Sequence, residues 1–450
     1  MVVDKQLFCD KFTNSVKILV HQIPIFLKKW LPFLATHYML LASRNNLGDK
    51  VEVNKTIGSM LIIAGTTIGA GMLALPIASA GLGFTTATLL LFAMWLLMTY
   101  TALLMLELHQ HANQKATLNT LAKSILGKKG QIVANFSMLF LLYALCAAYI
   151  AGGGTQLQGK INLALGTDLS PQVGSVILAI IVATVITLGT STVDKLNRVL
   201  FATKIVVLAS VFYMLTPHVN GKHLLDLPIE QGLILSAIPI VFTSFGFHSS
   251  IPSIVRYVGV DIKSLRKVMI IGASLPLVIY LFWQLISQGL MPQQTLMQSE
   301  GLPGFMASVA EIAKSDTVAT AVTIFADLAL ATSFLGVSLG LFDFLNDALK
   351  CSDDTKGRVV TALVTYMPPL CFALFYPQGF IMALGYAAVA LVVLAIFLPV
   401  AMVWRQRQQP ELVGYSVKGG SIGLMIAAIF GVLIIAAQGM QMVGLIPAIG

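Results

Sequence analysis

The sequence has few charged residues and is dominated by apolar ones. Only 10% of its 450 residues are Asp, Glu, Lys or Arg, whereas 57% are hydrophobic. Soluble domains carry about 25% charged residues, so this composition excludes a soluble globular protein. It predicts an all-α membrane protein that crosses the bilayer many times and has little soluble mass.

The sequence also lacks the motifs expected of an enzyme or an ATP-driven pump. Its four cysteines are scattered and make no metal-binding spacing. The apolar segments contain no H-E-x-x-H motif and no paired carboxylates, and no G-x-x-x-x-G-K-[ST] loop occurs. We therefore expect neither enzymatic activity, nor a metal site, nor a cofactor.

Long apolar segments indicate the membrane spans. A spanning helix needs about 20 mainly apolar residues, and the chain offers eleven such segments. We predict spans at 56–79, 83–107, 131–153, 173–190, 196–216, 232–257, 268–290, 317–342, 359–376, 379–403 and 421–445.

The basic residues predict the orientation of these spans. With a cytoplasmic N-terminus, 24 of the 28 Lys and Arg residues fall on the cytoplasmic side and three fall outside. Cytoplasmic loops of membrane proteins carry such an excess, so we predict a cytoplasmic N-terminus and a periplasmic C-terminus. The net charge of +9 then faces anionic lipid, and binding to nucleic acid is not needed to explain it.

We predict that residues 1–53 form an N-terminal extension ahead of the eleven spans. Its apolar part, 19–44, carries Lys28 and Lys29 at the centre, where two charges make spanning costly. We expect a cytoplasmic or interfacial helix. The alternative is a misassigned start, with the working protein beginning near Asn54.

Two of the predicted spans are interrupted. The stretch "IAGTTIGAGMLALP" (63–76) breaks the first, and "FTSFGFHSSIP" (242–252) breaks the sixth. Interrupted spans five apart and of opposite orientation are typical of an inverted five-plus-five repeat. The alternative is that small residues only let helices pack closely. We predict a transporter domain at 54–445, with repeats at 56–216 and 232–403 and an extra helix at 421–445.

A break at membrane depth leaves backbone groups that lipid cannot satisfy. The N–H groups of the half-helix after Gly65–Gly69 suit a carboxylate. Carbonyls near Ile63–Ala64 and Phe242–Thr243 suit an ammonium, so together the breaks fit an amino acid. The candidate binding residues of the first break are Ala64, Gly65, Thr66, Thr67, Gly69, Ala70 and Gly71.

Several motifs in order resemble one known family. These are "GTTIGAGMLALP", "NRVLFATK", "TSFGFHSSIPS" and "ATSFLGVSLGLFDFL", and the similarity extends over about residues 54–445. The chain resembles the bacterial aromatic amino acid permeases, the tyrosine- and tryptophan-specific proton symporters of the amino acid–polyamine–organocation superfamily. The resemblance implies a LeuT-type fold with broken helices 1 and 6. It also implies import of an aromatic amino acid with protons across the inner membrane.

Aromatic residues and a histidine gather at the second break. We expect Phe242, Phe245 and Phe247 to stack on the substrate or to close over it as a gate. His248 could bind a phenol or an indole, or its ring could be satisfied by the carbonyls of the break itself. The remaining candidate substrate-binding residues are Thr243, Gly246 and, on the third span, Tyr143, with Tyr149 of the same span as a further candidate for the pocket wall.

Lys204 lies about halfway along the fifth span. A lysine at this depth is costly and usually functional. Its ammonium could occupy the place of a sodium ion in sodium-coupled relatives, held by a first-break carbonyl at Gly65 or nearby and by Thr332 and Ser333. We expect it to couple transport to protons, the alternative being a fixed structural charge. Asp327 is a second candidate, as a proton relay or in a structural hydrogen bond.

The leading hypothesis is thus a proton-coupled symporter, with tyrosine favoured as substrate and tryptophan next. Its expected partners are the amino acid, protons and the lipid bilayer, with no obligate protein partner. Two alternatives stay open: a sodium-coupled or other amino acid permease of the same fold and, more remotely, a proton-conducting structural subunit. Lys204 argues against sodium, since its positive charge would repel that ion.

Overall fold

Long apolar segments fold as helices because lipid offers no hydrogen-bond partners for the backbone. The computed structural model describes residues 47–226, 232–299, 301–349, 355–409 and 414–447. Most of the predicted extension, residues 1–46, lies outside the described residues.

The helices follow one another with short connections. The α-helices are α2 (Leu47–Thr67), α3 (Ala70–Ala78), α4 (Gly83–His109), α5 (Leu118–Leu165), α6 (Pro171–Thr187), α7 (Thr190–Leu215), α8 (Gly232–Ser244), α9 (Ile251–Val258), α10 (Ile262–Leu290), α11 (Gln293–Met297), α12 (Gly301–Ala313), α13 (Asp316–Leu349), α14 (Thr355–Phe375), α15 (Phe380–Val392), α16 (Leu398–Gln406) and α17 (Gly420–Met442). Short 3-10 turns are η1 (Ala80–Leu82), η2 (Thr216–His218), η3 (His223–Leu225) and η4 (His248–Ser250), and η5 (Val393–Phe397) is a π-helical turn between α15 and α16.

Within the described residues, nine helices are long and apolar enough to cross a membrane, or ten if the bent pair α2–α3 is one span. The predicted fourth span corresponds to α6, whose 17 residues make it slightly shorter than these. The third span extends beyond the prediction, because α5 continues through Lys160 to Leu165. Lys160 therefore lies on a helix rather than in a loop.

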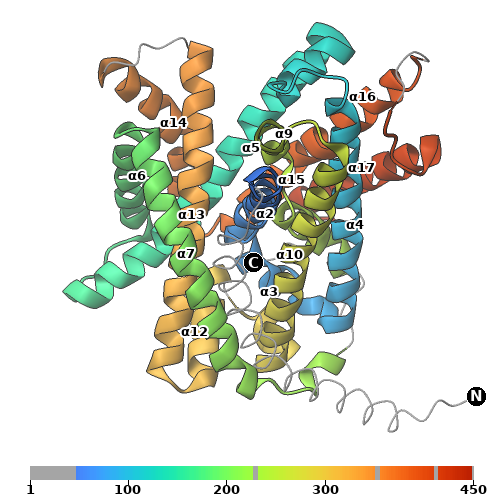
Figure 1. Ribbon diagram of the computed structural model, residues 1–450. Coiled ribbons are helices and arrows are strands. Elements are labelled where there is room, and N and C mark those ends of the chain that lie inside the picture. The colour runs from blue at the N-terminus through green and yellow to red at the C-terminus, as the bar shows by residue number, and fades with distance from the viewer. Residues whose placement is uncertain (1–46, 227–231, 300, 350–354, 410–413, 448–450) are drawn as a thin grey trace, which may run out of the picture.

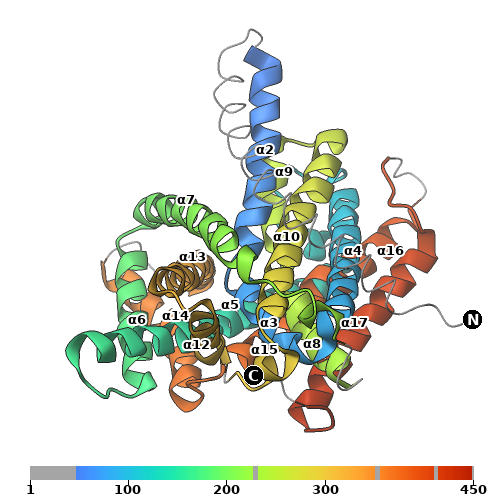
Figure 2. The same ribbon diagram turned by 90° about the horizontal axis from the view of Figure 1, so that it is seen from below.

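The helices form two flanks around a central group. In Figures 1 and 2, α6, α7, α13 and α14 lie on one side and α4, α16 and α17 on the other, with α2 and α10 between them. The long helix α5 packs against α6, α13, α14 and α15, so it connects the groups. Both interrupted spans lie in the core of this arrangement.

Both predicted interruptions are present. The chain bends by 52° between α2 and α3, at Ile68 and Gly69. In the second case α8 ends at Ser244 and helical structure resumes at His248. Because α3 packs against α8, the two breaks lie beside each other in the bundle.

Candidate functional site

The first break forms where threonine hydroxyls compete with backbone amides for the carbonyls of the preceding helical turn. The hydroxyl of Thr67 donates to Ile63 O at 2.9 Å and that of Thr66 to Ile62 O at 2.8 Å. Such bonds back to the preceding turn tend to bend helices. Gly69 follows directly, and a Cβ atom there would overlap the Ser333 hydroxyl. A side chain at this position would therefore have to displace the Ser333 hydroxyl of α13.

The exposed backbone groups lie further along the chain than we predicted. Ala64 O accepts from Ile68 N at 2.8 Å, and Ile63 O is bonded to Thr67. Neither is free for an ammonium, because α2 continues helically to Thr67. The carbonyls of Phe242 and Thr243 are likewise taken, by the amides of the turn that closes α8.

Tyr280 of α10 connects the two breaks. Its hydroxyl oxygen lies 2.6 Å from Thr67 O and 2.6 Å from Ser244 O, the last residues of α2 and α8. A hydroxyl carries one proton, so it donates to one of these carbonyls at a time. The ring is fully buried and packs edge-on against Phe245 at 5.0 Å. One side chain thus holds the ends of both half-helices.

Two serines make further contacts with the first break, one from the second break and one from α13. The Ser244 hydroxyl lies 3.0 Å from Gly71 O, and Ser333 of α13 accepts from the Ala70 amide at 3.2 Å. Gly69 N–H donates to none of the described residues. The start of α3 therefore keeps one amide donor free, beside the positive end of the helix dipole.

Lys204 of α7 reaches the same linker. Its ammonium donates to Ile68 O at 2.6 Å and to Thr332 Oγ1 at 2.9 Å, and lies 4.9 Å from the centre of the Phe201 ring. The side chain is fully buried, and within the described residues it has no carboxylate partner. The carbonyl it binds is that of Ile68, which lies in the predicted break near Gly65, while Gly65 itself faces Phe201. Ser333, the other predicted partner, does not bind Lys204 and accepts from the Ala70 amide instead.

A cavity of about 90 Å³ lies between the breaks. Its volume is below the roughly 300–1,000 Å³ typical of ligand pockets, so a ligand with an aromatic side chain enters only when neighbouring groups move. Tyr149 and three leucines of α5 line one wall. Eight of the predicted site residues also line it: Thr66, Thr67, Gly69, Ala70, Gly71, Thr243, Gly246 and Ser333.

The predicted aromatic gate lies elsewhere. Phe242, Phe245 and Phe247 are fully buried and do not line this cavity, and Ala64 is also packed away from it. His248 Nε2 bonds to the Thr101 hydroxyl of α4 at 2.9 Å, not to the carbonyls of its own break. These side chains are therefore packed in the core of the bundle and do not face the cavity.

Tyr143 was predicted to line the pocket but does not. Its hydroxyl donates to Val364 O of α14 at 2.8 Å. Tyr149, six residues later and mostly buried, lines the cavity instead. The two tyrosines lie on different faces of α5, since six residues rotate a helix well away from a full number of turns.

Asp327 does not meet Lys204. Its carboxylate pairs with Lys160 of α5, and both side chains are about a third or more exposed. The pair borders a mostly apolar cavity of about 300 Å³ between α5, α6, α7 and α13. Its position leaves the Lys204 site without a carboxylate from α13.

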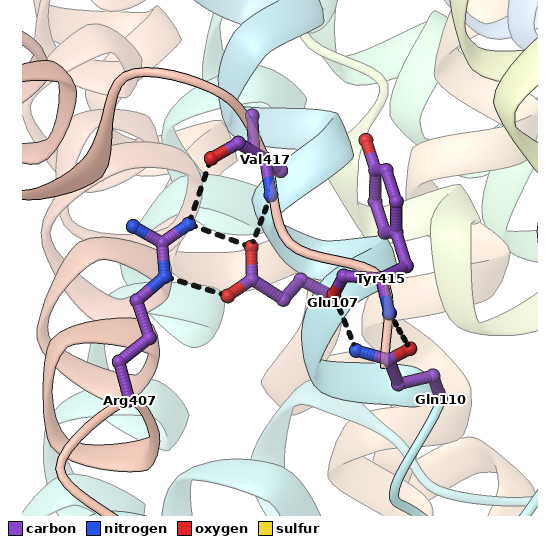
Figure 3. Close-up of polar contacts among 5 residues, drawn as sticks. All are labelled: Glu107, Gln110, Arg407, Tyr415 and Val417. Atoms are coloured by element: carbon purple, nitrogen blue, oxygen red, sulfur yellow. Dashed lines mark hydrogen bonds and ion pairs between the residues drawn. The ribbon is translucent and has the colours of Figure 1, made fainter. Parts of the chain in front are cut away.

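A second polar cluster closes one end of the bundle (Figure 3). Glu107 at the end of α4 accepts two bonds from Arg407, at 2.7 and 2.8 Å, and one from the Val417 amide at 2.8 Å. Gln110 exchanges two bonds with the backbone of Tyr415, at 2.6 and 2.7 Å. This cluster clamps the connection between α16 and α17 onto α4, and Glu107 is buried within it.

No group of three or more His, Cys, Asp or Glu side chains within the described ranges is placed to hold a metal ion. The site is instead built from main-chain atoms, hydroxyls and one ammonium. Of its residues, Tyr280 had no sequence signal, because it lies in an ordinary apolar span. Ser244 lay inside the predicted second break but was not singled out.

Comparison with known proteins agrees with this architecture. The chain is 43% identical over 387 residues to tyrosine-specific transport system 1 of Haemophilus influenzae, covering 85% of this chain and 96% of that protein. It is 35% identical over 396 residues to the tryptophan-specific transport protein of the same organism, covering 85% and 95%. It is 30% identical over 401 residues to the low affinity tryptophan permease of Escherichia coli, covering 87% and 97%.

The family assignment extends over nearly the whole described chain. Residues 52–438 match the tryptophan/tyrosine permease family, a family of transport proteins and not of enzymes. The match includes both breaks, Lys204, Tyr280 and the clamp residue Arg407. The chain therefore belongs to the tryptophan/tyrosine permease family.

Proposed function

We propose that this protein is a proton-coupled symporter that imports an aromatic amino acid, with tyrosine preferred over tryptophan, across the bacterial inner membrane. The observation that carries the proposal is the cavity between the two breaks, which main-chain atoms of α2–α3 and α8 border. Main-chain donors and acceptors at helix ends are complementary to the charged groups of an amino acid.

The two ends of the substrate's head group would bind different breaks. Its carboxylate would meet Gly69 N–H and the start of α3, where the helix dipole favours negative charge. Its ammonium would meet Thr67 O and Ser244 O. Tyr280 supplies only one proton to these two carbonyls, so an ammonium with three donors can satisfy the acceptor that the tyrosine leaves.

The side chain would enter between α5, α13 and α15. This part of the cavity is lined by Leu141, Leu145, Val337 and Leu391, with Tyr149 beside them. An apolar wall with one aromatic residue suits a phenol or indole ring. The wall must move outward to admit it, as alternating access requires.

Lys204 is the proposed proton site. A cation buried without a counter-ion is costly, and in membrane proteins it marks an ion or proton pathway. With its proton, Lys204 holds Ile68 O, one residue before Gly69. When the proton leaves, this grip on the linker weakens, so protonation and substrate binding would act on the same residues. Asp327 pairs with Lys160, which makes a structural role more fitting for it.

The proposed architecture is the LeuT-type five-plus-five inverted repeat, with eleven spans. Counting α2–α3 and α6 as spans brings the nine long helices to this number. The repeats would occupy 56–216 and 232–403, with α17 as the extra helix and 1–53 as the extension. The distribution of Lys and Arg supports a cytoplasmic N-terminus and a periplasmic C-terminus.

The similarities support tyrosine as the preferred substrate. Two relatives named tyrosine-specific transport systems share 43% and 41% identity with this chain, more than the 35% of the tryptophan-specific protein of the same organism. The test is uptake of labelled tyrosine by the purified protein in liposomes, with an inward proton gradient and no sodium. Unlabelled tyrosine, tryptophan and phenylalanine then compete for uptake.

The matched variants separate coupling from transport itself. Lys204→Ala should abolish accumulation against a gradient while exchange of internal for external tyrosine continues. Lys222→Ala, at a lysine in a loop, should behave as wild type. Accumulation by Lys204→Ala would contradict the coupling role, and a requirement for sodium would favour a sodium-coupled symporter. Purified protein that transports alone would also support the absence of an obligate partner.

A further inference from the structure

A large cavity lies at the end of the bundle that carries the α4–α5 connection, away from the two breaks. Its volume is about 680 Å³. The end of α4, the connection itself, the first turns of α5 and the end of α16 surround it. No step of the proposed transport cycle uses it.

The walls of this cavity are positively charged. Lys115 of the α4–α5 connection and Arg405 of α16 line it from different elements, with His111 beside them. No Asp or Glu is among the lining residues. In the part of the chain that the structure describes, neither Lys115 nor Arg405 forms an ion pair. Among the described residues, the cavity therefore offers cations without a counter-ion.

Arg407 differs from Arg405, because its side chain is already paired. Its guanidinium is occupied by Glu107 and by Val417 O (Figure 3), and Glu107 raises its pKa by hydrogen bonding. Arg405, two residues earlier, instead opens onto the cavity. Arginine forks match the oxygens of a phosphate group, and the side-chain amides of Asn113 and Gln409 add neutral donors at the same cavity.

The position of the cavity near the membrane surface suits a lipid headgroup. Trp404, adjacent to Arg405, is 59% exposed, and tryptophan is enriched at the membrane–water interface. Leu121 and Ile125 add apolar side chains to the lining. A phosphate beside the cations and methylene groups beside these apolar residues would satisfy both parts.

We propose that this cavity binds the phosphate of an anionic phospholipid, which bridges Lys115 and Arg405 and so ties the start of α5 to α16. Basic pockets between membrane helices on the cytoplasmic side are known to take such headgroups. The inference rests on the proposed orientation, which puts this end of the bundle at the cytoplasmic leaflet. It does not depend on the identity of the transported substrate.

The test measures lipid binding by the purified, full-length protein. Native mass spectrometry and thermal unfolding in detergent are recorded with phosphatidylglycerol, phosphatidylcholine or soluble glycerol 3-phosphate. We expect phosphatidylglycerol alone to give a retained adduct and a higher unfolding midpoint. The double variant Lys115→Gln/Arg405→Gln should bind phosphatidylglycerol roughly 30-fold more weakly, since each charge near anionic lipid contributes about 1 kcal/mol.

The control changes the same net charge outside the cavity. Lys128→Gln/Lys129→Gln removes two exposed lysines beside Gly127, neither of which lines the cavity, and should bind lipid as wild type does. An equal loss in this control would overturn the proposal, because general surface charge would then explain binding. Stabilisation by glycerol 3-phosphate at equal concentration would overturn the lipid as the source of phosphate. None of these measurements uses transport, so their failure is separable from failure of the proposed function.

Discussion

Replacing Tyr280 with phenylalanine tests whether one hydroxyl holds the two interrupted spans together. The substitution keeps the ring that packs on Phe245 and removes only the hydroxyl between Thr67 O and Ser244 O. Both carbonyls end a half-helix, so neither has an amide of its own helix to replace the lost donor. The change therefore acts on the geometry of the breaks and not on core packing.

The expected free-energy cost follows from the number of hydrogen-bond donors that the substitution removes. A buried acceptor left without its donor costs about 1–3 kcal/mol. Because the hydroxyl has one proton, this cost applies once although two carbonyls are affected. The conformation in which the two breaks are held together is destabilised by that amount. The fraction of molecules ready to bind falls accordingly, which predicts a Kd for tyrosine raised by about 5–150-fold.

The assay is equilibrium binding of labelled tyrosine to purified protein, with the thermal unfolding midpoint recorded in parallel. Tyr366→Phe is the control, because that tyrosine is also buried and its hydroxyl forms no hydrogen bond to either break. We expect the control to bind as wild type does. An unchanged Kd in Tyr280→Phe, with an unchanged midpoint, would refute the reasoning.

Three further predictions concern the linker, the clamp and a helix start. Gly69→Ala should weaken tyrosine binding about 5–150-fold, because its Cβ must displace the Ser333 hydroxyl; equilibrium binding measures this. Glu107→Gln should lower stability by about 1.5 kcal/mol, the lower end for bonds to a charged group, because Arg407 is 22% exposed to solvent; thermal unfolding measures this. Asp261→Ala should lower stability by about 1 kcal/mol. Hydrogen bonds from Ser264 lower the Asp261 pKa, so the difference should start to shrink below about pH 4, the unfolded value, and be lost once the pH falls past the lowered folded pKa.

Each of these has a matched comparison. Gly336→Ala, where a Cβ would meet no atom within 4 Å, controls for the added methyl group. Asp194→Ala controls for Glu107→Gln, since its pair with Arg198 is exposed and within one helix and should contribute little. Wild-type binding by Gly69→Ala, equal losses for the two acidic variants, or a pH-independent effect of Asp261→Ala would each contradict the corresponding argument.

The interruptions themselves were predictable from sequence, but Tyr280, which contacts both of them, was not. Glycine, threonine, serine and proline inside an apolar run weaken a helix locally, and both breaks occur in the stretches so marked. Lys204 was also identifiable, because a charge in the middle of an apolar span is rare. Its contact with Thr332 matches the expected partner, since both lie near the middle of their spans.

Details that depend on helix rotation could not be derived. Whether Tyr143 or Tyr149 faces the cavity, and whether Asp327 faces Lys160 or Lys204, is decided by how α5 and α13 turn about their axes. The free carbonyls were misplaced because the sequence does not show where α2 ends: its backbone stays helical to Thr67, so the carbonyls of Ile63 and Ala64 are still bonded. Tyr280 has no local signal, because its role comes only from its distance to two backbone atoms.

The linker of Ile68 to Ala70 has a consequence for how variants of this protein can be rescued. Lys204, Tyr280 and Ser333 all bind main-chain atoms at this linker or at its edge, and they come from three different helices. None of these bonds therefore involves the side chain of Ile68. A genetic screen for suppressors of a damaged linker should accordingly recover second-site changes in α7, α10 and α13, far away in the gene, more readily than changes beside the original lesion.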